Sequence, residues 1–472
     1  MRPLELTLAF AVLVSIVLLL VDPRRADRLF VIVLSFSIVL VCVHALAEGL
    51  HWQLMPLYAC APLLALAFLY SSAMPQWLLR SCTIAGAGLL FAGVAFSYVL
   101  PMFRLPDPTG PYQVGTRLLY LVDSSRQEIH GPFPRGNREL MVQLWFPTEC
   151  PCGRLARYRR RTETTLLSSY MSVLRTHSYA DAPIAKSGPS FPVLLFNPAW
   201  KNPRTQNTFQ FEDLASHGFV VASIDPTYTS QQVAFPDGRR ITSKDMPEIG
   251  DFSKLTWQEV VILGDQELAY QTADDRFVLD SLNRLNLDPM SDYFGRLNSD
   301  DAGAFGHSFG GAVAMEICRS DSRVRAALNM DGWFFGDVAK YGLDKPLFIM
   351  SDDSPASPKE DLHSPNVVRR LRAEWMRQDI QRTNYTLEKF GGWYMVIRDS
   401  RHMIFSDRAL YSPIRSLRES GPVDSRAAHQ IIESYSLAFF SKYLKGETSR
   451  LLEETPSRFP GAELKIYSRP GN

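Results

Sequence analysis

Residues 306–310 have the sequence Gly-His-Ser-Phe-Gly, a Gly-x-Ser-x-Gly motif that can present a nucleophilic serine hydroxyl. The apolar run Ala302–Phe305 precedes this motif and the helical pattern Ala312–Arg319 follows it. Between a strand and a helix, the motif makes a sharp turn that exposes the serine oxygen, and its glycines allow close packing. The pattern predicts a serine hydrolase with Ser308 as the nucleophile.

An aspartate and a histidine follow two later apolar runs. Asp331 comes directly after Val324–Met330, and His402 comes shortly after Tyr394–Ile397. Functional residues of an open α/β sheet gather at the carboxyl ends of its strands, so we expect all three side chains at one rim. The order Ser, Asp, His is that of an α/β-hydrolase. His402 would take the serine proton, and Asp331 would hold the imidazole in the required tautomer.

Other acids and histidines compete for these roles. Asp352 and Asp353 follow the run Pro346–Met350 and are the alternative acid. His307 is fixed in the turn and is expected to point away from the serine, and His217 is expected to be structural. The remaining histidines lie in or beside apolar spans or away from the predicted rim: His44, His51, His130, His177, His363 and His429.

A tetrahedral oxyanion needs preorganised N–H donors. The backbone N–H of Phe309, at the positive end of the helix that follows the serine, is the first candidate. The second should come from the loop Asn197-Pro198-Ala199-Trp200, which follows another apolar run. Since proline has no N–H, Trp200 is favoured.

From residue 190 onward, short apolar runs alternate with helical patterns. Such a sequence predicts a mostly parallel sheet with helices on both faces. Two earlier segments, Gly115–Asp123 and Arg138–Pro147, are candidates for an antiparallel start of the sheet. The further runs and helical segments are Pro192–Phe196, Phe219–Ile224, Asp265–Leu285, Asn366–Arg382 and Ser425–Lys445, the last of which is expected to close the chain.

The first hundred residues contain four apolar stretches, each close to the ~20 residues that cross a bilayer as a helix. Four in succession exclude a single cleaved signal peptide. The third is interrupted by two prolines. The stretches are Leu4–Val21, Leu29–Ala47, Leu54–Tyr70 and Ser81–Leu100, and they predict a multi-pass membrane protein.

Basic residues beside these stretches predict their orientation. The first connection holds Arg24, Arg25 and Arg28, the third holds Arg80, and the second, Glu48–Gln53, has no Lys or Arg. The positive-inside rule then places the first and third connections in the cytoplasm and the catalytic part outside it.

A proline-rich link, Pro101–Pro111, predicts a domain boundary, with a transmembrane region at 1–104 and a catalytic domain at 105–472. Within the latter, residues 231–263 are a candidate lid, with an ordinary surface insertion as the alternative.

Composition excludes several partners. The 472 residues include 50 Lys and Arg against 49 Asp and Glu, so nothing indicates a nucleic acid. The six cysteines lack a matching histidine spacing, and we expect no metal and no cofactor. Cys150 and Cys152 form a Cys-x-Cys pair whose oxidation state the sequence leaves open.

Five motifs together resemble the plasma-type platelet-activating factor acetylhydrolases and their bacterial relatives. The resemblance covers roughly residues 105–445. The motifs occupy residues 305–311, 331–333, 215–219, 109–116 and 142–147.

The resemblance implies an α/β-hydrolase fold, no metal, and cleavage of short or oxidised sn-2 acyl groups from phospholipids. It also implies Asp331 as the acid and an oxyanion N–H at Trp200, although the family commonly has Ser-His-Gly where this chain has Asn197-Pro198-Ala199. The membrane spans are absent from the secreted members, and we expect a bacterial cell (inner) membrane here.

The sequence therefore predicts a membrane-anchored serine esterase that forms an acyl-enzyme on Ser308 and acts on a lipid or small-molecule ester. A general carboxylesterase or polyester hydrolase is the alternative, because a triad does not encode the acyl pocket. A non-catalytic membrane scaffold on a hydrolase fold is a third hypothesis. The oligomeric state is not indicated.

Overall fold

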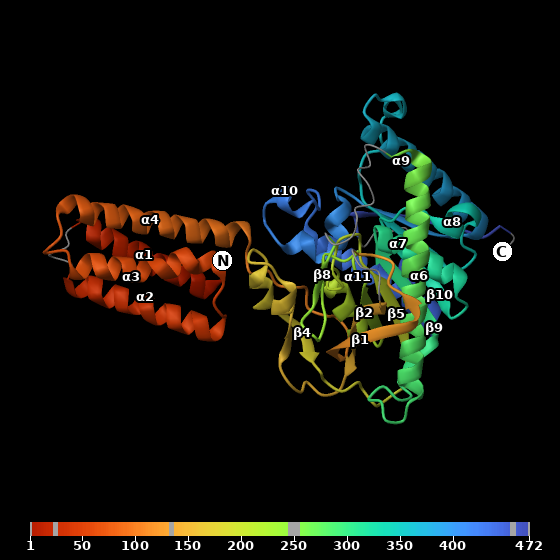
Figure 1. Ribbon diagram of the computed structural model, residues 1–472, viewed down its shortest axis with the longest axis horizontal. Coiled ribbons are helices and arrows are strands. Elements are labelled where there is room, and N and C mark those ends of the chain that lie inside the picture. The colour runs from red at the N-terminus through yellow and green to blue at the C-terminus, as the bar shows by residue number, and fades with distance from the viewer. Residues whose placement is uncertain (1, 22–26, 132–135, 244–254, 454–458, 471–472) are drawn as a thin grey trace. The chain divides into compact units, whose positions relative to one another are not determined.

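In the computed structural model, residues 2–21, 27–131, 136–243, 255–453 and 459–470 are described (Figure 1). The chain divides into two compact units. The first comprises Met1–Arg104, Arg157–Thr176 and Leu410–Arg418. The second comprises Leu105–Ala156, His177–Ala409 and Glu419–Asn472.

The first unit contains four long helices. They are α1 (Pro3–Val21), α2 (Asp27–Ala47), α3 (Met55–Leu69) and α4 (Gln76–Val99), and the short 3₁₀ helix η1 (Trp52–Leu54) leads into α3. All four are long and apolar enough to cross a membrane, α3 when η1 is counted with it. The predicted third span is helical in spite of its two prolines. Pro56 stands in the first turn, where no N–H is needed, and Pro62 lies inside the helix.

Apolar side chains of this bundle lie both inside and outside it. Leu8, Val12 and Leu64 are buried between the helices, whereas Phe10 and Phe91 are exposed. An apolar exterior over a packed apolar interior is the surface that lipid requires. Arg24 and Arg25, on which the predicted orientation partly depends, fall outside the described residues.

An eleven-stranded sheet has the order β13-β12-β11-β10-β9-β5-β6-β2-β1-β4-β3. The neighbours from β6 through β5, β9, β10 and β11 to β12 pair in parallel, and β2 pairs antiparallel with both β1 and β6. The predicted α/β-hydrolase arrangement with an antiparallel start is confirmed. The strands are β1 (Gln113–Gln127), β2 (Asn137–Thr148), β3 (Leu155–Arg157), β4 (Arg175–Ala180), β5 (Phe191–Asn197), β6 (Val220–Asp225), β9 (Leu297–His307), β10 (Val324–Met330), β11 (Leu347–Ser351), β12 (Gly392–Ile397) and β13 (Ala462–Tyr467).

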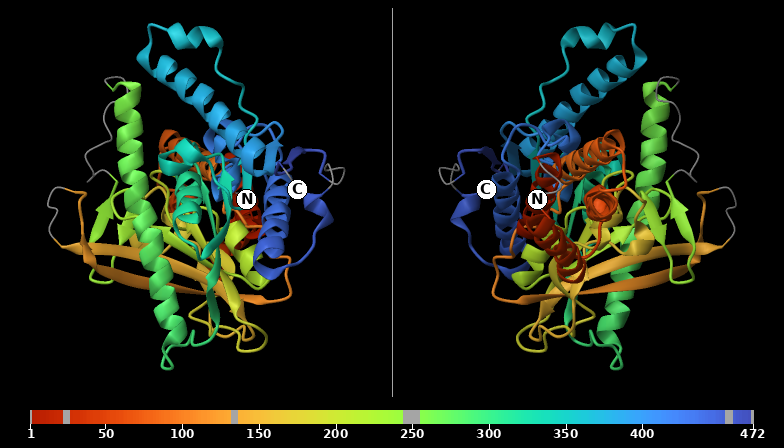
Figure 2. Two further views of the ribbon diagram at one scale, coloured as in Figure 1. Left: turned by 90° about the vertical axis from the view of Figure 1, so that its right-hand side faces the viewer. Right: turned by 90° about the vertical axis from the view of Figure 1, so that its left-hand side faces the viewer.

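Helices cover both faces of this sheet (Figure 1), and Figure 2 shows α9 extending away from it. Alternation along each strand sends successive side chains to opposite faces. On β5, Leu195 belongs to the core that includes Leu279 of α6, while Phe196 packs 4.6 Å, ring to ring, from Phe211 of α5. The helices of this unit are α5 (Thr208–Ser216), α6 (Trp257–Leu287), α7 (Phe309–Ser320), α8 (Gly336–Tyr341), α9 (Val367–Phe390) and α11 (Ser425–Lys445).

Several predicted boundaries are wrong. The helix predicted from Asp265 begins at Trp257, because the Thr256 hydroxyl and the Glu259 side chain cap its first turn reciprocally. Helix α11 does not close the chain, since β13 follows it and pairs antiparallel with β12.

The candidate lid at 231–263 overlaps a two-stranded hairpin, β7 (Gln232–Ala234) and β8 (Arg240–Thr242), as well as the start of α6. Residues 244–254 fall outside the described residues, and the lid stays a prediction. After β2, the structure joins Cys150 and Cys152 by a disulfide.

A buried carboxyl group on α11 leads to a stability prediction. Burial, followed by the negative charges of Asp213 and Asp407, raises the pKa of Glu433 to about 9. This pKa is above the unfolded value of ~4.3, so the protonated group supports folding fully below that value, and the support is lost as the pH rises through about 9.

We therefore expect Glu433→Gln to raise the free energy of unfolding at pH 8 by about 2–4 kcal/mol and to leave it nearly unchanged near pH 4. Thermal unfolding of the full chain at both pH values measures the difference. An equal shift at both would show that the carboxylate is not destabilising.

Candidate active site

Ser308 lies between the last residue of β9 and the first residue of α7. Its backbone has φ 56° and ψ −126°, a conformation that side-chain-bearing residues rarely adopt. Its N–H donates to Met330 O at 2.8 Å, which fixes the turn to the neighbouring strand β10. A Cβ on Gly306 would overlap Gly310 O, and one on Gly310 would overlap Asn197 O, so the turn requires glycine at both positions.

Asp331 and His402 are joined directly. The Nδ1–H of His402, at the start of the 3₁₀ helix η6 (His402–Phe405), donates to Asp331 Oδ2 at 2.5 Å. Asp331 Oδ1 accepts from the Ser351 hydroxyl at 3.2 Å and from the Asp352 N–H at 3.1 Å. With the proton of the neutral imidazole on Nδ1, the other nitrogen, Nε2, is left as an acceptor.

The two groups shift each other's protonation. Partial burial by itself lowers the pKa of His402, but the hydrogen bond to Asp331 and its negative charge raise that pKa above the usual value. Burial by itself raises the pKa of Asp331, but the hydrogen bond and charge of His402 bring it below the usual value. The histidine is therefore able to take up a proton while the aspartate stays ionised.

The alternative acids contact other groups. Asp352 accepts hydrogen bonds from the N–H and hydroxyl of Ser354, and Asp353 accepts from the Asp399 N–H at 2.9 Å. In the described part of the chain, neither carboxylate is hydrogen-bonded to His402.

The Ser308 hydroxyl makes no hydrogen bond to any described residue, so the structure joins His402 to Asp331 and does not join Ser308 to His402. Ser308 still lies at the same rim, because it is bonded to the residue before Asp331 and follows His307, whose ring is 4.5 Å from that of His402. Hydrogen bonds between a catalytic serine and histidine often reach their short, aligned geometry only in the complex with substrate.

His307 does not point away from the site, contrary to the prediction, because β9 ends under η6 and the imidazole fills the space between them. Its Nε2–H donates to His402 O at 2.9 Å, and its Nδ1 accepts from Gln206 Nε2 at 2.5 Å. Burial, followed by the charge of His402, lowers the pKa of His307 to about 3, so the ring stays neutral. Gln206 lies in no recognisable motif, so its role could not be predicted from the sequence.

Gln206 also fixes the loop that follows β5. Its Oε1 accepts the Ala199 N–H at 2.8 Å, and Pro198 has no N–H. The next backbone donor is Trp200. Among the described residues, the backbone N–H groups of Trp200 and Phe309 have no hydrogen-bond acceptor, and their two rings lie 5.4 Å apart. Both predicted oxyanion donors are thus unpaired.

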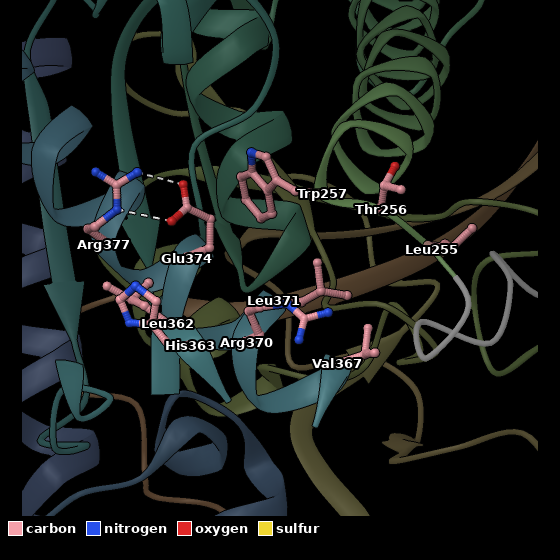
Figure 3. Close-up of a pocket in the computed structure, with 10 residues that line it drawn as sticks. All are labelled: Leu255, Thr256, Trp257, Leu362, His363, Val367, Arg370, Leu371, Glu374 and Arg377. Carbon is pink, nitrogen blue, oxygen red and sulfur yellow. Dashed lines mark hydrogen bonds and ion pairs between the residues drawn. The ribbon is translucent and has the colours of Figure 1, made fainter. Parts of the chain in front are cut away.

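Aromatic rings extend from these two residues along the second unit. Successive ring centroids are 5.4–5.5 Å apart in the order Trp200, Phe309, Phe335 and Trp375. Trp257 and Trp333 both lie beside Trp375, at 5.4 and 3.8 Å. Trp257 also lines a cavity of about 660 Å³ between the start of α6 and α9, together with Leu371 and the ion pair Arg377–Glu374 (Figure 3). Ser308, Asp331 and His402 do not line this cavity.

The chain is similar to a family model and to proteins named as lipid-ester hydrolases. The family model described as "Platelet-activating factor acetylhydrolase, isoform II" matches residues 99–260 and 272–451. The platelet-activating factor acetylhydrolase of Cavia porcellus is 24% identical over 370 residues, which cover 72% of this chain and 78% of that protein. A probable 1-alkyl-2-acetylglycerophosphocholine esterase of Arthroderma benhamiae is 26% identical over 286 residues, 54% of this chain and 65% of that protein.

A solved ferulic acid esterase from Streptomyces cinnamoneus superposes with a TM-score of 0.60 and 28% identity, covering 78% of this chain and 99% of that one. The family match spans well over half of the chain and includes all five motifs that carried the resemblance. The chain therefore belongs to the platelet-activating factor acetylhydrolase, isoform II, family, and it is a serine ester hydrolase with an α/β-hydrolase fold.

Proposed function

We propose that Ser308, Asp331 and His402 form the catalytic triad of an esterase that removes short or oxidised sn-2 acyl groups from phospholipids. The observation that carries this proposal is the 2.5 Å hydrogen bond from His402 Nδ1 to Asp331 Oδ2. It is the bond that a triad needs in order to keep the second imidazole nitrogen free for the serine proton.

The reaction follows from these positions. Ser308 Oγ attacks the ester carbonyl while His402 Nε2 takes its proton, and Asp331 stabilises the imidazolium that forms. The N–H groups of Phe309 and Trp200 bind the oxyanion. His402 then gives its proton to the leaving glycerol oxygen, which departs as a lysophospholipid. Water, activated by the same histidine, hydrolyses the acyl-enzyme and restores the serine.

A phospholipid ester fits the rest of the chain. One relative is named for a 1-alkyl-2-acetylglycerophosphocholine, and Trp333, the exposed ring of the aromatic series, offers an apolar face to a lipid. Residues 105–472 would carry catalysis, and the helices of residues 1–104 would hold it at a bilayer, raising the local concentration of membrane substrates.

The proposed location is a bacterial inner membrane, with the catalytic part on the extracytoplasmic side. The placement of basic residues supports this orientation, since Arg28 and Arg80 lie at the connections assigned to the cytoplasm.

A second candidate function is hydrolysis of aryl or other simple carboxylic esters. Similarity to the ferulic acid esterase over 99% of its chain favours it, and an aromatic surface also suits a flat aromatic acyl group.

The nucleophile is tested by Ser308→Ala in the full chain. We expect loss of fluorophosphonate labelling and a fall in kcat of about 10⁵-fold or more, because no other hydroxyl replaces Oγ. Ser320→Ala, at the far end of the same helix α7, is the matched control and should keep wild-type labelling. Labelling that persists in Ser308→Ala would sink the assignment and favour another nucleophile.

The acid and base are tested by pH. Since the pKa of His402 is raised, kcat/KM should increase with pH through a value above the usual ~6.5, where the imidazole becomes neutral. Asp331→Asn should move this inflection to lower pH and reduce kcat about 10⁴-fold. Asp352→Asn should cost less than about 10-fold. A larger loss of kcat in Asp352→Asn than in Asp331→Asn would identify Asp352 as the acid.

Substrate class is tested by comparing kcat/KM for a phosphatidylcholine with an sn-2 acetyl group, its long-chain counterpart, and an aryl acetate. We expect kcat/KM for the short-chain phospholipid to be about 10²-fold or more above that for the long-chain one, because each extra methylene must fit a pocket shaped for a short acyl group. A clear preference for the aryl ester would favour the second candidate function.

A further inference from the structure

Three buried side chains of the first unit converge at one end of its helical bundle. Glu5 comes from α1, His44 from α2, and His51 from the segment just before η1. Glu5 is 1% exposed, His44 0% and His51 4%, and one ligand atom from each lies within 4.8 Å of the others. Glu48, one turn after His44, adds a second carboxylate.

The polar atoms at the centre of this cluster lack hydrogen bonds. In the described part of the chain, Glu5 Oε1, His44 Nε2, His51 Nε2 and Glu48 Oε2 are all shielded from solvent without a hydrogen-bond partner. Glu48 Oε2 also forms an ion pair with Arg2 Nη1 at 3.7 Å. Buried polar atoms are nearly always paired, so the three from Glu5, His44 and His51 that converge within 4.8 Å of one another indicate a missing ligand. The separations are 3.4 Å between His51 Nε2 and Glu5 Oε1 and 3.3 Å between His44 Nε2 and Glu48 Oε2.

The outer contacts of His51 decide which of its nitrogens is free. Gln53 Nε2 donates to Leu100 O at 3.1 Å, which turns Gln53 Oε1 toward the His51 ring. His51 Nδ1–H then donates to that oxygen at 3.1 Å. In the neutral ring, Nε2 therefore presents a lone pair to the Glu5 carboxylate, an arrangement that is repulsive unless a cation lies between them.

His44 is supported in the same way. Its Nδ1 lies 3.0 Å from the Tyr58 hydroxyl, and donation from Nδ1–H to that oxygen leaves Nε2 free to point at the cluster. A hydrogen bond that fixes the far nitrogen of a histidine is the usual outer support of a metal ligand.

We propose that Glu5, His44, His51 and Glu48 bind one divalent transition-metal ion, with Zn²⁺ as the best match to the donor set. Two imidazole nitrogens and two carboxylate oxygens suit Zn²⁺. A tetrahedral ion with bonds of ~2.1 Å needs ligand atoms ~3.4 Å apart, close to the two short separations above. Two carboxylates also offset the charge of a dication within an apolar bundle, and the Arg2 guanidinium that pairs with Glu48 is one-third exposed to solvent.

The site belongs to the first unit, whereas the proposed triad belongs to the second, and it goes beyond the proposed function. It is structural, because it links the start of α1, the end of α2 and the segment before α3. No metal was expected from the sequence, because the six cysteines have no matching histidine spacing. The informative spacing is His44, Glu48 and His51, while the remaining ligand, Glu5, lies some forty residues earlier.

The test uses the full chain in detergent with any affinity tag removed. The protein is loaded with Zn²⁺, desalted, and analysed for bound metal, and a parallel sample is loaded with Co²⁺ for visible spectroscopy. We expect about one Zn²⁺ per chain and the intense visible bands of tetrahedral Co²⁺. Metal-free wild-type protein after loading would overturn the proposal and leave a proton-sharing Glu–His pair in its place.

Variants locate the site. Glu5→Gln and His51→Gln should each reduce bound metal at least 10-fold and abolish the Co²⁺ bands, while Ser308 remains open to fluorophosphonate labelling. Ser37→Ala, a buried hydroxyl on α2 bonded only within its own helix, and His363→Gln, an exposed histidine, should both retain the metal.

A chelator should lower the Tm of the wild-type protein and have no effect on the Tm of either ligand variant. Equal metal retention by Glu5→Gln, His51→Gln and wild type would overturn the proposal, as would equal loss in Ser37→Ala or His363→Gln. Because labelling at Ser308 is followed separately, a failure of the esterase proposal does not alter the metal result.

Discussion

The parallel pairing of β9, β10 and β11 is the constraint on which the site depends. His307 is in register with Met330, and Met330 with Met350, so the three strands end side by side. The residues that follow, Ser308 and Asp331, donate their N–H groups to Met330 O and Met350 O at 2.8 and 2.7 Å. Both have positive φ, which turns each chain sharply at the sheet edge. Strand register alone thus brings the proposed nucleophile and acid together across a long stretch of sequence.

A buried polar chain then positions the elements that do not belong to those strands. The His307 ring donates to His402 O and accepts from Gln206, and Gln206 accepts the Ala199 N–H next to the predicted oxyanion donor Trp200. One neutral imidazole therefore connects the segment that carries the proposed base to the loop that carries a proposed oxyanion donor. Every link is paired, as a buried polar network requires if it is to hold one geometry. His307, the residue before the serine in the Gly-x-Ser-x-Gly motif, therefore positions the site as the two glycines of the motif do.

The sequence was sufficient where local patterns coincide with the fold. Apolar runs gave the parallel strands, and the rule that ligands gather at strand ends selected Ser308, Asp331 and His402 before their geometry was known. It was insufficient where a contact joins distant segments. Nothing near Gln206 indicates that it would meet His307, and β13 was missed because its alternating, half-exposed residues are stabilised by β12 rather than by their own pattern. The start of α6 was placed too late because its capping box depends on polar residues that carry no apolar periodicity.

The two polar clusters of this chain follow the same physical rule with opposite results. Around His307, the buried donors and acceptors are matched, so the ring needs no charge and the site is complete without further ligands. Around His44 and His51, outer hydrogen bonds fix one nitrogen of each ring and turn the other toward carboxylates that offer no proton. Lone pairs directed at one another in an apolar bundle cost energy that a shared cation recovers. A histidine with both nitrogens paired is therefore explained by the fold, whereas two histidines and the Glu5 carboxylate, which converge without hydrogen bonds at their facing atoms, are explained by a bound ion.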